Sequence, residues 1–162
     1  MWLWPILVFS IAHALDDGFL DVIPPLLPIF GQRYGLTNAQ LGTLILALTI
    51  PCNFGQPLFG IILDRHRYRG AASIGLLLAL AGVVLAITST SLLTLAAGLF
   101  LTGLGTGIFH PASGAWVGEM GGVSRRAQAL SIFGGIGSAG YALGAVAGPI
   151  MYKRFGQDGI AW

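Results

Sequence analysis

Five ionisable side chains stand inside long apolar stretches of this sequence. The first stretch contains His13, Asp16, Asp17 and Asp21, and a later one contains His110. An ionisable group inside a membrane span costs about 2.5–3.5 kcal/mol on insertion scales, so such a group is treated first as functional. A carboxylate and an imidazole at similar depth can share a proton. This set is therefore a candidate for proton coupling.

Helical spacing sorts these residues onto faces. His13, Asp17 and Asp21 are four residues apart, so at about 100° per residue they step by about 40° and lie within one arc. Asp16 falls about 100° from Asp17, and we expect it to point elsewhere and to matter less. If the two spans run in opposite directions, His13 and His110 lie at similar depth, with Asp17 near the midplane. A structural ion pair, or a bond from His110 to a neighbouring backbone carbonyl, stays open as the alternative.

The composition excludes a soluble domain. The chain has 162 residues, of which 55% are hydrophobic and 9% charged, and its mean hydropathy is +0.81. Soluble domains carry roughly 25% charged residues. We therefore expect an integral membrane protein. The net charge of +2 is too small to indicate a nucleic-acid partner, and the lone Cys52 excludes a disulfide framework or a thiolate metal site. No cofactor and no metal are expected.

Five apolar stretches are long enough to cross a membrane. They predict an all-α, polytopic transmembrane helix bundle that forms a single domain over residues 1–162. We expect loops at 31–40, with a helix cap, and at 119–126, and we read the first stretch as a retained span rather than a signal peptide. The predicted spans cover residues 3–30, 41–63, 71–88, 92–118 and 127–152.

The arginines predict an orientation. Three of them crowd the short loop after Asp64, and positive charge in short loops favours the cytoplasmic side. Strict alternation of the spans then places the N-terminus in the cytoplasm of a multi-pass protein in the cell (inner) membrane. The tally of basic residues is five inside against three outside: Arg65, Arg67, Arg69, Arg125 and Arg126 against Arg33, Lys153 and Arg154.

Prolines and glycines predict where helices bend and where they touch. The prolines at 24, 25 and 28 should bend or loosen the outer end of the first span, because a proline lacks an amide donor. Gly140, Gly144 and Gly148 recur every four residues before Pro149, which puts a smooth stripe on one helix face. Close helix packing is the expected role of such a stripe.

One loop resembles a known family. The segment from Gly60 to Arg69 is similar to the loop between helices two and three of the major facilitator superfamily, whose pattern is Gly-x-x-x-Asp-Arg/Lys-x-Gly-Arg/Lys-Arg/Lys. Gly60, Asp64, Arg65 and Arg69 fit this pattern, whereas Arg67 and Tyr68 depart from it. Because Asp64 sits at a helix end beside arginines, where charge pairing and a helix terminus can hold one state, we expect these four residues to form a conformational latch. The segment 144–149 is similar to the family's antiporter signature, although Met151 and Tyr152 replace its next glycine pair.

Further stretches resemble the fosmidomycin resistance protein group within that superfamily. They are His13 with Asp17 or Asp21, and the segments 25–28, 56–60 and 105–112. The resemblance implies five of the first six helices of a twelve-helix transporter that exports small molecules or drugs in exchange for protons. Gln56 would join the ionisable residues in the substrate cavity. The expected partners are a small-molecule substrate, protons, the bilayer, and a missing C-terminal half or a second copy.

Two other classes of function compete with transport. An intramembrane enzyme could use His13, Asp17 and His110 as metal ligands or acid–base groups, but no HExxH or comparable motif is present, so we expect no enzyme. A non-transporting helical module that binds a partner is the second alternative. A bound metal would favour the enzyme, and a second homologous half would favour the transporter over the module.

Overall fold

The computed structural model describes residues 2–66 and 68–155, and every regular element in this part of the chain is helical. The first predicted span is divided. Helix α1 covers Leu3–Val22, a 3₁₀ turn η1 covers Pro24–Leu26, and helix α2 covers Leu27–Tyr34. The break falls where the consecutive prolines remove backbone donors, as the sequence predicts. The helix nevertheless resumes after the break and ends four residues beyond the predicted limit.

The connection between α2 and α3 is shorter than the predicted loop. Gly35 caps the end of helix α2, and its φ of 65° lies in the left-handed region that glycine adopts without strain. Helix α3 (Asn38–His66) then begins with the predicted cap. The Thr37 N–H donates to Gln40 Oε1 at 2.9 Å, and the Gln40 N–H donates to Thr37 Oγ1 at 3.4 Å. This reciprocal pair is a capping box.

Helix α4 (Ala71–Ile87) matches the third predicted span to within one residue. The last element, α5 (Leu92–Phe155), contains both remaining spans as two helices that meet at a kink inside the predicted loop at 119–126. The chain reverses there at Gly122, whose φ of 59° and ψ of −176° interrupt the helix. A glycine reaches that conformation without a Cβ clash. We call residues 92–121 the first arm of α5 and residues 123–155 the second arm.

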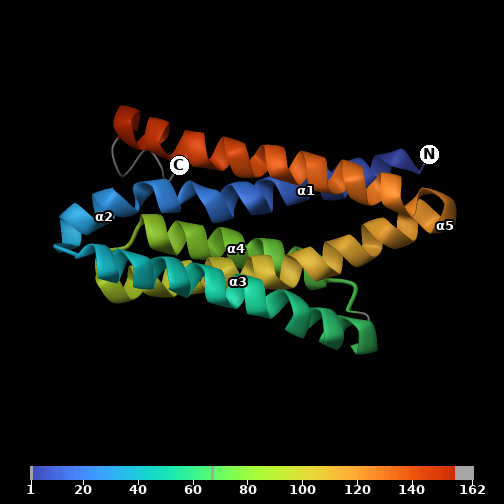
Figure 1. The fold of residues 1–162 in the computed structure, drawn as a ribbon, viewed down its shortest axis with the longest axis horizontal. Coiled ribbons are helices and arrows are strands. Elements are labelled where there is room, and N and C mark those ends of the chain that lie inside the picture. Colours follow the sequence, from blue (N-terminus) through green and yellow to red (C-terminus); the bar gives the residue numbers. More distant parts are fainter. Residues whose placement is uncertain (1, 67, 156–162) are drawn as a thin grey trace.

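The two arms of α5 organise the bundle. In Figure 1 the first arm runs back beside α3 and α4, and the second arm runs beside α1. Glycines permit each contact. A Cβ on Gly105 of the first arm would lie 2.6 Å from the Gly75 carbonyl of α4, and one on Gly107 would lie 2.7 Å from the Pro51 carbonyl of α3. A Cβ on Gly148 of the second arm would lie 2.6 Å from the Val22 carbonyl of α1.

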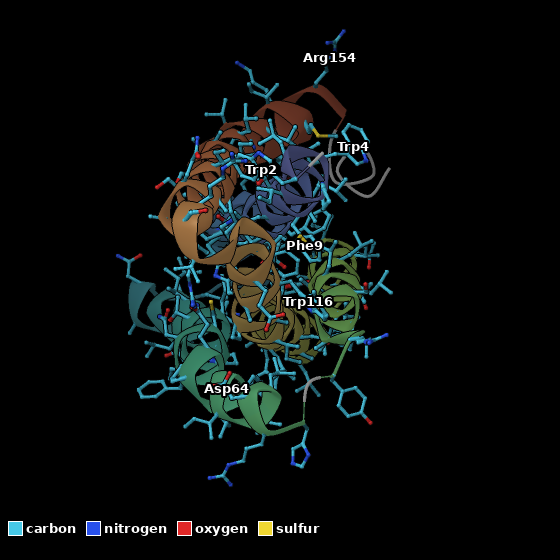
Figure 2. The ribbon with its side chains drawn as sticks, turned by 90° about the vertical axis from the view of Figure 1, so that its right-hand side faces the viewer. Trp2, Trp4, Phe9, Asp64, Trp116 and Arg154 are labelled. Carbon is cyan, nitrogen blue, oxygen red and sulfur yellow. The ribbon has the colours of Figure 1, made fainter. Side chains whose placement is uncertain are left out.

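The outer surface is apolar. Trp4, Phe54, Leu93 and Leu143 are each more than two-thirds exposed, and Figure 2 shows Trp4 on the periphery of the bundle. Large apolar surface of this kind marks a membrane or a partner rather than water. Within the described residues, α3 and the long helix from residue 92 to 154 are long and apolar enough to cross a membrane, while α4 is a shorter apolar helix.

Candidate functional site

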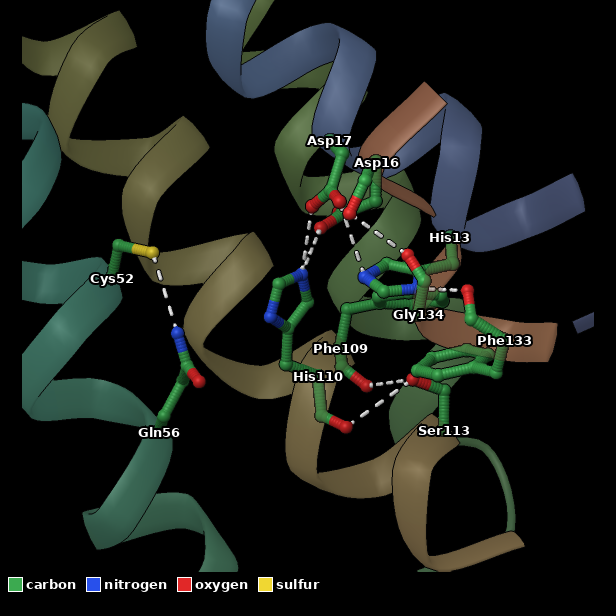
Figure 3. A network of polar contacts seen from close by, with 11 residues as sticks. His13, Asp16, Asp17, Cys52, Gln56, Phe109, His110, Ser113, Phe133 and Gly134 are labelled. Atoms are coloured by element: carbon green, nitrogen blue, oxygen red, sulfur yellow. Dashed lines mark hydrogen bonds and ion pairs between the residues drawn. The ribbon is translucent and has the colours of Figure 1, made fainter. Parts of the chain in front are cut away.

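The two arms of α5 enclose the acidic face of α1 and bring its ionisable residues to the first arm. Asp17 is the centre of the contact (Figure 3). Its Oδ2 lies 3.2 Å from His13 Nε2, and its Oδ1 lies 3.0 Å from His110 Nε2. The two imidazole rings meet edge to face with centroids 4.8 Å apart. His13 and Asp17 are buried, and the His110 side chain is 24% exposed.

The structure therefore gives His110 a carboxylate partner. The alternative in which His110 bonds a neighbouring backbone carbonyl does not describe its ring, because Nε2 points at α1 across 93 residues of sequence. A histidine bonded to a carbonyl does occur in the site, but it is His13. We call His13, Asp17 and His110 the central cluster.

His13 is held by the second arm of α5. Its Nδ1 lies 3.0 Å from the Phe133 carbonyl oxygen, and the two rings stack with centroids 4.0 Å apart and planes 18° apart. Because a carbonyl only accepts, Nδ1 carries the proton in this bond and Nε2 faces Asp17. Gly137 makes room for the ring, since a Cβ there would overlap it. The sequence contains one signal for this contact: Gly137 extends the predicted stripe by three residues.

The expectation that Asp16 points away from the site is wrong. Its side chain is fully buried, and Oδ2 lies 3.4 Å from His110 Nε2. Among the described residues, neither carboxylate oxygen has a hydrogen-bond partner. The helical-wheel argument fails because α1 lies between the two arms of α5. An angular offset of about 100° takes a side chain from one covered face to another, and not to the outside.

Asp21 and Gln56 lie beside the central cluster and not within it. Asp21 is half-buried, one turn from Asp17, and its carboxylate lies within reach of the Tyr141 hydroxyl. Gln56 projects from α3, where its Nε2 donates to the Cys52 sulfur at 3.7 Å (Figure 3). The sequence missed this contact, although the two residues are four apart on one helix.

The proposed latch residues lie at the far end of α3. Asp64 and Arg65 are exposed on the last turn, Arg69 is exposed in the following loop, and Figure 2 shows Asp64 at this end of the bundle. A Cβ on Gly60 would lie 3.7 Å from Pro111 of the first arm. Arg67 lies outside the described residues. A cavity of about 390 Å³ separates this region from the first arm, and its lining includes Gly60, Asp64, Arg69, Trp116 and Glu119.

The predicted glycine stripe faces α1. A Cβ on Gly140 would overlap the Ala14 backbone, one on Gly144 would overlap the Gly18 carbonyl, and Gly148 follows at Val22. Pro149 stands half-buried beside the last contact, inside the helix. These contacts fix the height of α1 against the second arm, and hence the height of His13.

The central cluster also has the composition of a metal-binding site. Suitable nitrogen and oxygen atoms of His13, Asp17 and His110 all lie within 4.8 Å of one another. Two imidazoles and a carboxylate can therefore exchange a proton or converge on a cation.

Comparison with known proteins gives two relatives. The chain is 31% identical over 160 residues to the uncharacterized MFS-type transporter YfnC of Bacillus subtilis (strain 168), an alignment that covers 98% of this chain and 39% of YfnC. It is 28% identical over 153 residues to the fosmidomycin resistance protein of Escherichia coli (strain K12), covering 94% of this chain and 37% of that protein. No solved structure matches the chain. The chain thus spans about two fifths of the length of these relatives.

The match to the family covers almost the whole chain. Residues 9–162 match the Major Facilitator Superfamily. This confirms the resemblance that the loop after α3 and the segment around His110 carry in the sequence. Together with the two long apolar helices, it identifies an integral membrane protein. The chain belongs to the Major Facilitator Superfamily, whose members are membrane transporters and not enzymes.

Proposed function

We propose that this chain is the N-terminal part of a proton-coupled secondary transporter that exports small molecules by alternating access. The observation that carries the proposal is the central cluster, in which Asp17 bridges two histidines. Charged groups at membrane depth are expensive, and where they occur they mark ion or proton pathways. Family membership supplies transport, and the cluster supplies a means of coupling it to protons.

The two histidines of the central cluster are held by different parts of the bundle. His13 belongs to α1 and is bonded to the second arm, whereas His110 belongs to the first arm. A conformational change that moves His110 away from α1 would break the bond between Asp17 and His110 and leave the bond between Asp17 and His13. Asp17 would then have two histidine partners in one conformation and one in the other, so its affinity for a proton would depend on conformation. Such a dependence is what coupling between a proton and a conformational change requires.

The membrane arrangement follows from the predicted spans. We propose five spans, formed by α1 with α2, by α3, by α4 and by the two arms of α5, as part of a six-helix N-terminal half. The N-terminus and the loop after α3 would be cytoplasmic, because the basic residues of that loop set the orientation. A second half, or a second copy, would complete the transport path, since alternating access needs two units that move against each other.

The substrate class comes from one relative. The name of the Escherichia coli protein states resistance to fosmidomycin, and export is one way to produce resistance. We therefore take a small, polar, drug-like molecule as the substrate class, and place it beside Asp21, Gln56 and His110, which are only partly buried. The latch residues would hold one conformation at the cytoplasmic end of the path.

The test uses the transport-competent protein that contains this chain, in inside-out membrane vesicles. Fosmidomycin is the probe, and a pH-sensitive dye reports proton movement. Addition of fosmidomycin should move protons outward from acidified vesicles as the drug enters. A protonophore should abolish drug accumulation. Accumulation that persists with the protonophore present would exclude proton coupling, and no accumulation of any drug-like probe would exclude export. Residues 1–162 reconstituted alone should show no flux.

A further inference from the structure

We propose that the central cluster, together with Asp16, is a binding site for a first-row divalent transition-metal ion, with Zn²⁺ as the ion that fits it best. The inference rests on the geometry of the donor atoms and is independent of the proposed transport function.

The spacing of the donor atoms suits four-coordinate zinc. Bonds of about 2.0–2.1 Å to nitrogen and oxygen place neighbouring ligand atoms of a tetrahedron about 3.3–3.4 Å apart. Asp17 lies 3.2 Å from His13 Nε2 and 3.0 Å from His110 Nε2 through its two oxygens, and Asp16 Oδ2 lies 3.4 Å from His110 Nε2. The donor atoms of His13, Asp17 and His110 all lie within 4.8 Å of one another, so a cation between them would draw the side chains together by rotation.

The orientation of His13 is that of a metal ligand. Metal-bound histidines commonly donate their second ring N–H to a carbonyl or carboxylate, which fixes the tautomer and aims the other nitrogen at the ion. His13 does this with the Phe133 carbonyl, at 3.0 Å, and stacking on the Phe133 ring holds its plane. Its Nε2 is thereby directed at Asp17 and at the rest of the site.

Asp16 provides the independent observation. It is fully buried, and neither of its carboxylate oxygens has a hydrogen-bond partner among the described residues. It forms a 3.4 Å ion pair with His110, and a buried carboxylate without a hydrogen bond is costly and calls for an explanation such as an ion. A bound cation between Asp16, Asp17 and the histidines would satisfy this carboxylate and balance the charge of both aspartates.

The donor set selects the kind of ion. Two imidazole nitrogens and two carboxylates suit zinc and its neighbours, whereas Ca²⁺ and Mg²⁺ prefer shells made of oxygen. Soft Cu⁺ prefers sulfur ligands, and Cys52 bonds Gln56 and is not among the clustered donors. Histidine and carboxylate together are also an established ligand set for zinc, in sites where three protein ligands leave the fourth position open.

The test measures metal binding by the purified chain in detergent. Isothermal titration with Zn²⁺ should give one site per chain, and X-ray absorption of the bound zinc should show nitrogen and oxygen neighbours at about 2.0–2.1 Å and no sulfur. His110→Gln and Asp17→Asn should each weaken binding at least about 10-fold, because each removes a ligand. The matched control is His66→Gln, which removes the exposed histidine at the end of α3 and should leave the affinity unchanged.

Three outcomes would overturn the proposal: no zinc site in the wild-type chain, equal affinity in wild type and both ligand variants, or loss of the site in His66→Gln. If a variant does not fold, X-ray absorption of the wild type decides alone, since a shell with sulfur or with oxygen only contradicts the assignment. These results are separate from transport. Absence of zinc binding with proton-coupled fosmidomycin flux intact would reject this site and leave the proposed function standing.

Discussion

The imidazole of His13 and the backbone of Phe133 are joined across 120 residues of sequence, by a 3.0 Å bond from Nδ1 to the carbonyl and by stacked rings. Helix α1 is thereby tied to the second arm of α5 at the level of the site. The glycine contacts at Ala14, Gly18 and Val22 extend the same attachment along α1. The Asp17 side chain contacts His13, which the second arm holds, and His110 of the first arm, so it links the two arms of α5.

Because His13 is attached in this way, we expect Gly137→Ala to destabilise the protein. The added methyl group would overlap the His13 ring, and that ring cannot move aside without losing its bond and its stacking. Overpacking of this kind costs about 1–3 kcal/mol. The thermal unfolding midpoint in detergent should therefore fall by several degrees. Gly135→Ala is the matched control, since the same change on the same helix meets nothing within 4 Å. Equal midpoints for the two variants would contradict the tight placement of His13.

Much of this fold follows from local sequence rules. The apolar stretches predict the helices, because a backbone in hydrocarbon must satisfy its own hydrogen bonds. The consecutive prolines predict the break after α1, and Thr37 with Gln40 predicts the cap of α3. The four-residue glycine spacing identifies the face of the second arm that meets α1. Each of these features depends on residues that are close together in the chain.

The features that sequence rules missed depend on pairing between distant segments. A helical wheel predicts the direction in which Asp16 points, but it does not predict which helix lies on that side. The contact with His110 therefore cannot be predicted from it. The partner of His13 is a backbone carbonyl, and a carbonyl has no residue-type signature. The reversal at Gly122 keeps helical hydrogen bonding on both sides, so a loop was predicted where a single positive φ suffices.

The orientation can be tested with single cysteines at the two ends of α3. Asn38 and Arg69 are both exposed, and they stand at opposite ends of a 29-residue helix. With Cys52 replaced by alanine, an impermeant thiol reagent added to intact cells should label Asn38→Cys, and should label Arg69→Cys only after the cells are opened. The background variant without cysteine should not be labelled. Labelling of both positions in intact cells would reject the predicted topology.

The proposed conformational latch at the end of α3 can be tested by substitution of Asp64. It lines the cavity between the end of α3 and the first arm, away from the central cluster, so it should act on conformation and not on substrate binding. Asp64→Asn in the transport-competent protein should slow turnover while the affinity for fosmidomycin changes by no more than a few-fold. Asp64→Glu, which keeps the charge, should recover part of the rate. If the affinity collapses in Asp64→Asn, this residue belongs to the binding site.

The last prediction concerns the carboxylates of α1, compared as a series of asparagine variants. Asp17 contacts both histidines, so Asp17→Asn should abolish proton-driven accumulation of the substrate while the protein still inserts and exchanges substrate across the membrane without a gradient. Asp16→Asn should also impair coupling, because Asp16 contacts His110. Asp21→Asn is the comparison: Asp21 lies one turn away, beside Tyr141 and the proposed substrate position, so its loss should lower substrate affinity in both assays while accumulation still depends on the proton gradient. Accumulation and gradient-free exchange are measured in the same vesicles, which separates a coupling defect from a folding defect. If Asp21→Asn lost proton-driven accumulation and Asp17→Asn kept it, the proton site would be Asp21, one turn along α1. If all three variants accumulated substrate at the wild-type rate, these carboxylates would only stabilise the helix.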